Sequence, residues 1–121
     1  MLINLDTQIV IHFLDGRLKD SERSLVEQND LGVCCIVLWE IAKLAQRGRI
    51  LRDPLDPAMG RFLERCMIWP IDLAIAVQST SLDFRSDPAD EIIAATSIVH
   101  RAPLLTRDAK IRASKLVPLA S

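Results

Sequence analysis

The stretch DPADEIIAATSIVHRAPLLTRD, residues 87–108, contains the signals of a helix followed by those of a buried strand. Asp87 followed by Pro88 favours a helix start, with the aspartate as N-cap and the proline in the first helical position. After this helix, the apolar run Ala102–Thr106 predicts a strand, which is followed closely by Asp108. A helix that leads directly into a short apolar strand is typical of an alternating α/β fold.

The same alternation continues through the rest of the chain. The other predicted strands are Leu2–Asp6, Gly32–Ile36 and Met67–Ile71, with Leu116–Leu119 as an edge strand. The predicted helices are Thr7–Leu14, Leu18–Gln28, Val37–Arg47, Ala58–Cys66, Leu73–Leu82, Pro88–His100 and Ala109–Lys115. Apolar strands without a polar face indicate a parallel sheet that is covered on both sides. We therefore expect an α/β protein: a three-layer α/β/α sandwich with a short, mainly parallel sheet, formed by residues 1–121 as a single domain.

Composition narrows the class of protein further. Half of the 121 residues are hydrophobic, which excludes a disordered chain, and the net charge of −1 excludes a globally basic nucleic-acid binder. No apolar run reaches the ~18 residues of a membrane span, and the N-terminus lacks the basic region of a signal peptide. The three cysteines have neither disulfide nor metal-binding spacing. We expect a cytoplasmic protein that does not bind membranes.

Four carboxylates lie where separate apolar segments stop or turn. Asp6 and Asp108 follow two strands, and ligands of parallel sheets bind outside the carboxyl ends of the strands. Glu40 and Asp90 share the apolar stripes of two helices and should point inward near the helix starts. Charges beside core-forming segments face a desolvation cost, and their mutual repulsion is tolerable only with bound cations. The pattern predicts a site for a divalent metal ion, because Mg²⁺ prefers carboxylate oxygens.

Each acid also has a structural alternative. Asp6 and Asp108 can cap the helices that follow them, and Asp90 can complete a capping box with Asp87. Glu40 has no such capping role, because it lies in the middle of its segment. Independent structural roles for four acids at convergent ends of one sheet are less probable together than one acidic site.

Several neighbours of the acids are candidates for supporting roles. Thr7 and Thr106 can hydrogen-bond a carboxylate or a water molecule. Arg47, on the face of Glu40, and Arg107, next to Asp108, can bind phosphate groups near the pocket. The two histidines, far apart in the chain and without a partner at ligand spacing, are expected to be surface or packing residues.

Four short motifs, taken together, resemble those of a known family. They are Leu5-Asp6-Thr7, Leu38-Trp39-Glu40-Ile41-Ala42, Asp87-Pro88-Ala89-Asp90 followed by Ile93-Ala94-Ala95-Thr96, and Leu105-Thr106-Arg107-Asp108. In this order and spacing, from Leu2 to about Ser114, the chain resembles a PIN-domain ribonuclease. The similarity is greatest to the VapC-type toxins of type II toxin–antitoxin pairs.

The resemblance implies a PIN-like α/β/α sandwich and a metal-dependent endoribonuclease that uses Mg²⁺ or Mn²⁺ to hydrolyse the phosphodiester bonds of RNA. Asp6, Glu40, Asp90 and Asp108 match the acidic catalytic quartet of the family, and Asp6 and Asp90 match the positions most directly associated with metal. A toxin also implies a cognate antitoxin protein as partner. The expected assembly is a homodimer or a heteromer with the antitoxin, with Trp39 or Phe62 as aromatic anchors of the dimer.

Three positions depart from the family pattern. Gln8 stands where asparagine is frequent, Glu91 where arginine is frequent, and Cys34 where serine or threonine is frequent. None of these removes a metal ligand, but Glu91 replaces a phosphate partner with a negative charge. A catalytically weak PIN-like module that binds RNA or protein therefore stays open as an alternative.

A receiver-type phosphoacceptor domain is the other alternative. Such a domain has a similar length and an acidic pocket, but it needs paired acids after its first strand and a lysine after a late one. Here the first strand is followed by Asp6-Thr7 and the late strand by Arg107-Asp108. A phosphatase of the haloacid dehalogenase type would need an Asp-x-Asp motif, which Gln8 interrupts.

Overall fold

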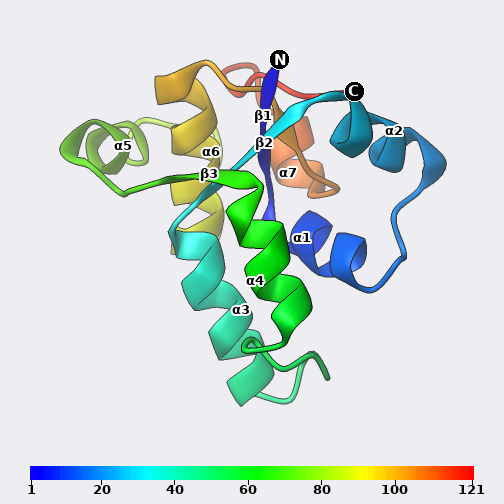
Figure 1. The fold of residues 1–121 in the computed structure, drawn as a ribbon. Coiled ribbons are helices and arrows are strands. Elements are labelled where there is room, and N and C mark those ends of the chain that lie inside the picture. The colour runs from blue at the N-terminus through cyan, green and yellow to red at the C-terminus, as the bar shows by residue number, and fades with distance from the viewer.

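A four-stranded parallel sheet with the strand order β3-β2-β1-β4 forms the centre of the computed structural model, which describes residues 1–121 (Figure 1). The strands are β1 (Leu2–Leu5), β2 (Asp30–Cys34), β3 (Cys66–Trp69) and β4 (Leu104–Leu105). The helices are α1 (Thr7–Leu14), α2 (Asp20–Gln28), α3 (Ile36–Gln46), α4 (Pro57–Glu64), α5 (Leu73–Gln78), α6 (Pro88–His100) and α7 (Ala109–Arg112).

The three layers follow from strands whose two faces are both apolar. In Figure 1, α5 and α6 lie on one side of the strands and α2 and α7 on the other. Ile3, Leu5 and Val33 lie on one face of the sheet and Asn4 and Cys34 on the other, and each has at most 1% of its surface exposed, so the middle of the sheet is covered on both faces. The predicted α/β/α sandwich with a parallel sheet is therefore confirmed.

Most predicted elements occur within a few residues of their expected bounds, and α1 has the predicted bounds. The strand predicted at Ala102–Thr106 is shorter, because only Leu104 and Leu105 pair with β1. The predicted edge strand Leu116–Leu119 is wrong: this segment makes only an isolated bridge, between Leu104 and Leu119. Pro103 and Pro118, which have no N–H to donate, limit the ladder at this edge.

Two aromatic residues proposed as dimer anchors have different environments. Phe62 is 3% exposed and its ring centroid lies 5.2 Å from that of Phe13, so it belongs to the core. The prediction that Phe62 anchors a dimer is therefore wrong, because α4 turns this side of the helix inward. Trp39, by contrast, is 53% exposed on α3.

A close contact between two strands requires a glycine. A Cβ atom at Gly32 would lie 2.5 Å from the ring of Trp69 on the neighbouring strand. The Trp69 ring in turn stacks on His100, with 5.2 Å between ring centroids. His100 is therefore a packing residue, as expected. Among the helices, none is both long and apolar enough to cross a bilayer.

Candidate metal centre

The four acids from separate parts of the sequence line one cavity of about 420 Å³. It lies at the carboxyl ends of β1 and β4, where Asp6 and Asp108 follow their strands, and α3 and α6 contribute Glu40 and Asp90. The lining residues are Asp6, Thr7, Gln8, Glu40, Leu44, Asp87, Asp90, Arg107 and Asp108. The position is the one that the topology of a parallel sheet favours for a ligand.

Asp6 is the most buried of the four acids, with 6% of its surface exposed. Its Oδ1 accepts a hydrogen bond from the backbone N–H of Thr7 at 2.8 Å, so it also caps α1. Its Oδ2 accepts a hydrogen bond from the Thr106 hydroxyl at 2.5 Å. Burial raises the pKa of Asp6, although the bonds from Thr106 and Thr7 oppose the rise; the charges of Asp90 and Asp108 add to it.

Glu40 points into the cavity from the first half of α3. The Thr7 hydroxyl donates a hydrogen bond to its Oε1. Burial raises the pKa of Glu40, against the hydrogen bond from Thr7, and the negative charges of Asp90, Asp6 and Asp87 raise it further. Thr7 therefore connects two acids of the cavity: its backbone binds Asp6 and its side chain binds Glu40.

Asp90 lies in the first turn of α6 and is half-buried. The Ser86 hydroxyl donates a hydrogen bond to its Oδ2 at 2.8 Å. Burial raises the pKa of Asp90, the bond from Ser86 opposes this rise, and the charge of Asp108 contributes to it. The alternative reading of Asp87–Asp90 as a capping box is wrong, because Asp87 makes no side-chain cap bond.

Asp108 both caps α7 and bonds to Thr106. Its Oδ1 accepts from the backbone N–H of Ile111 at 3.1 Å and so caps α7, as the sequence suggested. Its own N–H donates to the Thr106 hydroxyl at 3.0 Å. Thr106 thereby holds the two strand ends together, because the same hydroxyl donates to Asp6.

Three residues in or beside the cavity were not assigned to it from the sequence. Asp87 was assigned only as a cap, yet its carboxylate lines the cavity as a fifth acid. Ser86 orients Asp90 from the irregular segment before α6, where no periodic pattern marks it. Gln8, noted as a departure from the family pattern, lies in the cavity wall.

The donor set suits a hard cation but does not form a closed cage. No group of three acidic, histidine or cysteine side chains is gathered tightly enough to be a preformed metal site. Mg²⁺ usually keeps several water ligands and is held by one or two carboxylates, so this open arrangement fits it. The acids are nevertheless close enough to affect one another, because neighbouring carboxylates contribute to the raised pKa values of Asp6, Glu40 and Asp90.

The two arginines predicted to bind RNA differ in their surroundings. Arg107 lines the cavity, but its Nε and Nη2 donate to the Glu22 carboxylate at 2.8 and 2.6 Å. This ion pair lowers the pKa of Glu22 to about 2, and only Nη1 of Arg107 makes no hydrogen bond. Arg47 is exposed at the C-cap of α3 and lies outside the cavity lining.

Replacing Glu40 by glutamine is expected to stabilise the metal-free protein at neutral pH. The folded pKa of Glu40 lies above its ordinary value of 4.5, so ionisation costs folding free energy as pH rises from 4.5 through the folded value. Glutamine keeps an acceptor for the Thr7 hydroxyl and removes the charge. Thermal unfolding in a chelator should give a higher midpoint at pH 7 for Glu40→Gln, with the gain shrinking below pH 4.5. Glu27→Gln, on the exposed face of α2, is the control and should leave the midpoint unchanged. Equal midpoints for Glu40→Gln and wild type at pH 7 would show that ionisation of Glu40 does not destabilise the folded protein.

Comparison with known proteins identifies the family to which this chain belongs. The PIN domain family matches residues 3–115, and the chain therefore belongs to that family. The ribonuclease VapC22 of Mycobacterium tuberculosis is 30% identical over 98 residues, which cover 78% of this chain and 75% of VapC22. Within the PIN family, the chain thus groups with VapC-type proteins.

Solved structures agree with this placement at the level of the fold. The VapBC2 complex of Rickettsia felis, bound to a promoter DNA fragment, contains a chain with a TM-score of 0.76 at 19% identity, covering 99% of this chain and 98% of that one. A toxin–antitoxin complex of Klebsiella pneumoniae gives a TM-score of 0.71 at 23% identity, covering 92% of this chain and 90% of that one. FitAcB of Neisseria gonorrhoeae gives 0.67 at 21% identity, covering 99% and 97%.

Proposed function

We propose that this chain is a metal-dependent endoribonuclease, the toxin of a toxin–antitoxin pair, which hydrolyses RNA at the acidic cavity with Mg²⁺ or Mn²⁺. One observation carries the proposal. Three of the acids each accept a hydrogen bond from a different hydroxyl: Thr106 binds Asp6, Thr7 binds Glu40, and Ser86 binds Asp90. Caps alone would not need this arrangement, whereas metal ligands are commonly oriented by such neighbouring groups.

The acids differ in the roles that their surroundings favour. Asp6 and Asp90 would hold the metal ion, with Asp108 completing the shell directly or through water. A divalent ion in such a site lowers the pKa of a water molecule and stabilises negative charge on the phosphate that is cleaved. The raised pKa of Glu40 makes its carboxylate a better proton acceptor than an exposed glutamate. Glu40 would therefore take a proton from the attacking water, and the Thr7 hydroxyl would hold it in position.

The proposed activity is tested by incubating the purified protein with a mixed RNA pool, with Mg²⁺, with Mn²⁺ and with a chelator. We expect cleavage only when Mg²⁺ or Mn²⁺ is present. The cleaved RNA should carry no 2′,3′-cyclic phosphate at its new ends. Attack by water leaves such ends, whereas attack by the 2′-hydroxyl of RNA leaves a cyclic phosphate. Equal cleavage in the chelator would contradict the proposal.

Two alternatives are disfavoured by particular observations. The receiver-type domain requires a free cation beside its acids, but the cation here, Arg107, is held by Glu22, and the chain belongs to the PIN family. A catalytically weak binding module would not require three oriented acids. It predicts RNA binding that is independent of Mg²⁺ and no cleaved ends, so the same incubation separates the two functions.

The proposed partners are RNA and an antitoxin protein. Chains of similar fold occur in the VapBC2 structure of Rickettsia felis and in a toxin–antitoxin complex of Klebsiella pneumoniae, which supports a protein partner for this chain. An antitoxin segment can block an acidic cavity by placing an arginine against the carboxylates in paired, charge-assisted hydrogen bonds. Arg47 and Arg107 remain our candidates for contacts to the RNA backbone, Arg107 through its unengaged Nη1.

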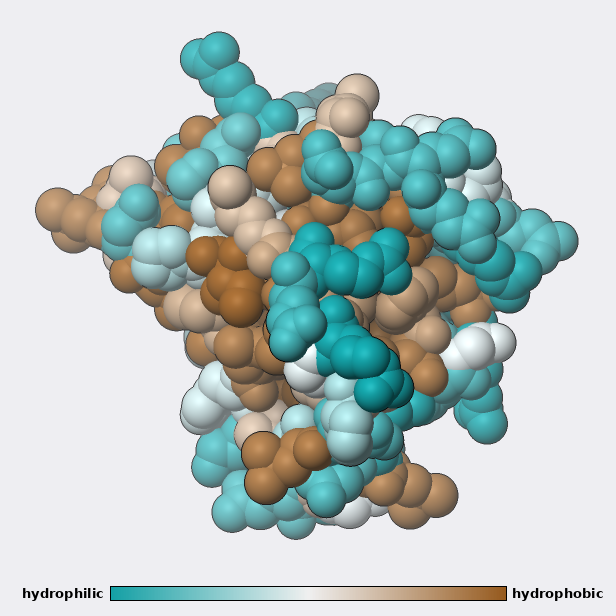
Figure 2. Space-filling view, viewed as in Figure 1, coloured by the Kyte–Doolittle hydropathy of each residue, from teal (hydrophilic) through white to brown (hydrophobic).

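We also propose that the chain forms a homodimer through an apolar surface on α3, α6 and the segment before α5. A depression of about 390 Å³ there is lined by Cys35, Ile36, Trp39, Ile71, Pro88, Ala89 and Ile92. Figure 2 shows hydrophobic surface, in brown, between α5 and the N-terminal end of α3. Exposed Leu73 and Val77 of α5 extend it, and contiguous apolar surface of this kind marks interaction sites.

Replacing Trp39 by aspartate should shift the protein from dimer to monomer. The indole is half exposed in the single chain, and the substitution removes the apolar contacts that it would make in the dimer. Aspartate also introduces a charge whose desolvation at the interface is unfavourable. Light scattering after size-exclusion chromatography measures the mass directly. Leu55→Asp, at a still more exposed apolar position in the loop before α4, should leave the mass unchanged. A monomeric wild type would rule out this interface.

A further inference from the structure

A second and larger cavity, of about 750 Å³, lies between α1 and the segment 49–56 that precedes α4. Its size falls within the range of ligand-binding pockets. The lining is mostly polar and contains three arginines and three aspartates. The lining residues are Gln8, Ile11, His12, Leu14, Asp15, Arg17, Arg49, Ile50, Leu51, Arg52, Asp53 and Asp56.

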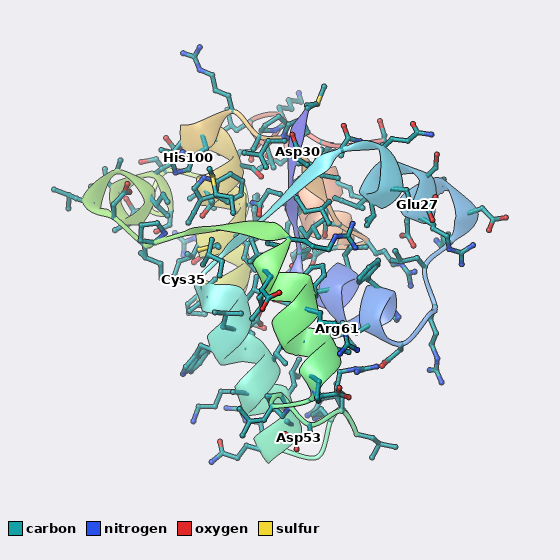
Figure 3. All side chains as sticks on the ribbon, in the orientation of Figure 1. Glu27, Asp30, Cys35, Asp53, Arg61 and His100 are labelled. Carbon is teal, nitrogen blue, oxygen red and sulfur yellow. The ribbon has the colours of Figure 1, made fainter.

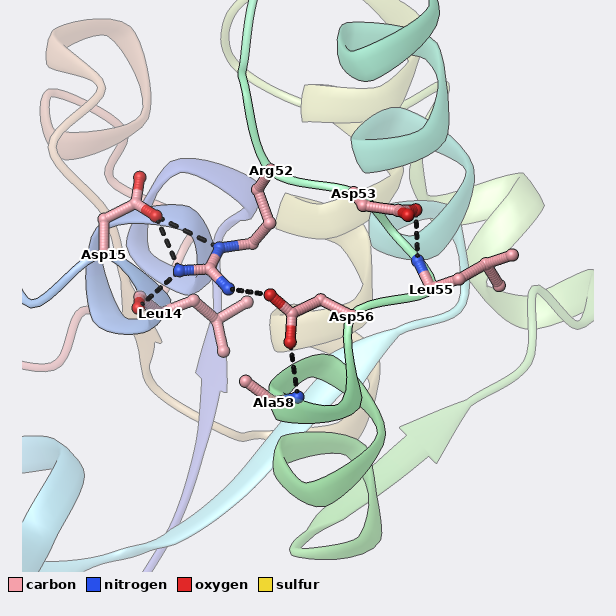
Figure 4. Close-up of polar contacts among 7 residues, drawn as sticks. All are labelled: Leu14, Asp15, Arg52, Asp53, Leu55, Asp56 and Ala58. Carbon is pink, nitrogen blue, oxygen red and sulfur yellow. Dashed lines mark hydrogen bonds and ion pairs between the residues drawn. The ribbon is translucent and has the colours of Figure 1, made fainter.

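Arg52 braces the two walls of this cavity (Figure 4). Its Nη2 donates to Asp15 Oδ1 at 2.9 Å and to the carbonyl oxygen of Leu14 at 2.7 Å, both at the end of α1. Its Nη1 donates to Asp56 Oδ2 at 3.1 Å, and the other oxygen of Asp56 caps α4 at Ala58. The arginine side chain is 17% exposed, so these bonds hold the cavity in a fixed shape.

The remaining two arginines have no such partners. Arg17 and Arg49, after α1 and after α3, make no side-chain hydrogen bond or ion pair. The carboxylates of Asp15 and Asp56 are occupied by Arg52, and Asp53 Oδ1 accepts from the backbone N–H of Leu55 at 2.9 Å. The lining therefore contains two arginines without a side-chain partner, while two of its three aspartates are paired with Arg52.

This cavity adjoins the acidic one. Gln8, in the first turn of α1, lines both cavities. A chain bound with one phosphate at the carboxylates can therefore continue past Gln8 to the arginines. The acidic cavity repels phosphates other than the one that metal binds, so flanking phosphates need positive charge elsewhere.

We propose that the cavity between α1 and residues 49–56 binds the RNA backbone next to the cleaved bond, with Arg17 and Arg49 contacting its phosphates. The inference rests on the proposed ribonuclease function and names the surface that holds its substrate. A docked protein helix is the other conceivable occupant. It would require an apolar groove, and only four of the 12 lining residues, Ile11, Leu14, Ile50 and Leu51, are hydrophobic.

The experiment measures binding of fluorescent single-stranded RNA of mixed sequence, in a chelator so that nothing is cleaved, at several KCl concentrations. Each phosphate contact contributes about 0.7 to the slope of log affinity against log salt for single strands. Arg17→Gln and Arg49→Gln should each lower the slope by about 0.7, and the double variant by about 1.4. Arg17→Lys and Arg49→Lys should restore most of it, because lysine keeps the charge.

Arg101→Gln is the matched control, because it removes one exposed arginine at the far end of α6. Figure 3 shows His100, its neighbour, at the opposite end of the molecule from Asp53. A double variant with the slope of Arg101→Gln would overturn the inference while leaving the ribonuclease function standing. A double variant that loses binding to a poly-glutamate peptide but binds RNA as well as wild type would also overturn the inference. That result would instead indicate that the cavity binds an acidic protein segment. A wild-type protein that neither binds nor cleaves RNA would instead refute the proposed function itself.

Discussion

Replacing Asp90 by asparagine is expected to abolish metal-dependent cleavage of RNA while leaving the protein folded. Asparagine has the shape of aspartate and still accepts the Ser86 hydroxyl, but it lacks the negative charge that a divalent ion requires. Loss of a group that merely orients a metal ligand costs about 10–100-fold, so loss of the ligand itself should cost at least about 100-fold. The cleavage rate at saturating Mn²⁺ measures the effect.

Asp30→Asn is the control for this variant. Asp30 is exposed at the start of β2, where it pairs with Leu2 at the amino end of the sheet, away from the acidic cavity. It should cleave RNA at the wild-type rate. Because burial and nearby charge raise the pKa of Asp90, the Asp90→Asn protein should also unfold at a higher temperature than wild type in a chelator at pH 7. A folded Asp90→Asn protein with normal cleavage would remove Asp90 from the mechanism.

Expression of this chain alone in its host, with the neighbouring open reading frame deleted, is expected to stop growth. A ribonuclease whose acidic cavity is open to solvent would cut cellular RNA unless an inhibitor were present. Growth should resume when the neighbouring gene is restored. Asp6→Ala should also restore growth, because Asp6 is the acid held most firmly, by Thr7 and Thr106. Colony counts after induction measure both effects.

The growth experiment also requires a measurement of how much of each protein the cells contain. Wild type, Asp6→Ala and Asp30→Asn should accumulate as folded protein to similar levels, with Asp30→Asn as toxic as wild type. Unimpeded growth with abundant, folded wild-type protein would contradict the toxin assignment. It would leave a PIN-type nuclease with another cellular role.

The sequence predicted the frame of the site because local signals and topology agreed. The cap at Asp6 and the apolar pattern of Thr7–Leu14 determine α1, whose bounds were predicted correctly. The parallel arrangement then brings Asp6 and Asp108 together, since both follow neighbouring strands. Glu40 could be identified because an acid on an apolar stripe is costly unless it faces a site.

The contacts that no local pattern encodes were missed. Ser86 and Asp87 lie in the irregular segment before α6, so periodicity gives no sign that Ser86 bonds Asp90 or that Asp87 lines the cavity. The pairing of Arg107 with Glu22 joins residues that are 85 positions apart, and only tertiary structure reveals it. The same holds for Arg52, which bonds Asp15 at a distance of 37 positions in the chain.

The central claim, that the acidic cavity is a metal-dependent site of RNA cleavage, is tested most directly by one titration. Mn²⁺ is added to the wild-type protein, and bound metal and the initial rate of RNA cleavage are measured in the same samples. The account predicts that cleavage is absent in chelator and rises in proportion to the occupied sites. Cleavage at full rate without bound Mn²⁺ would contradict it, as would saturation of the protein with Mn²⁺ and no cleavage of any RNA in the pool.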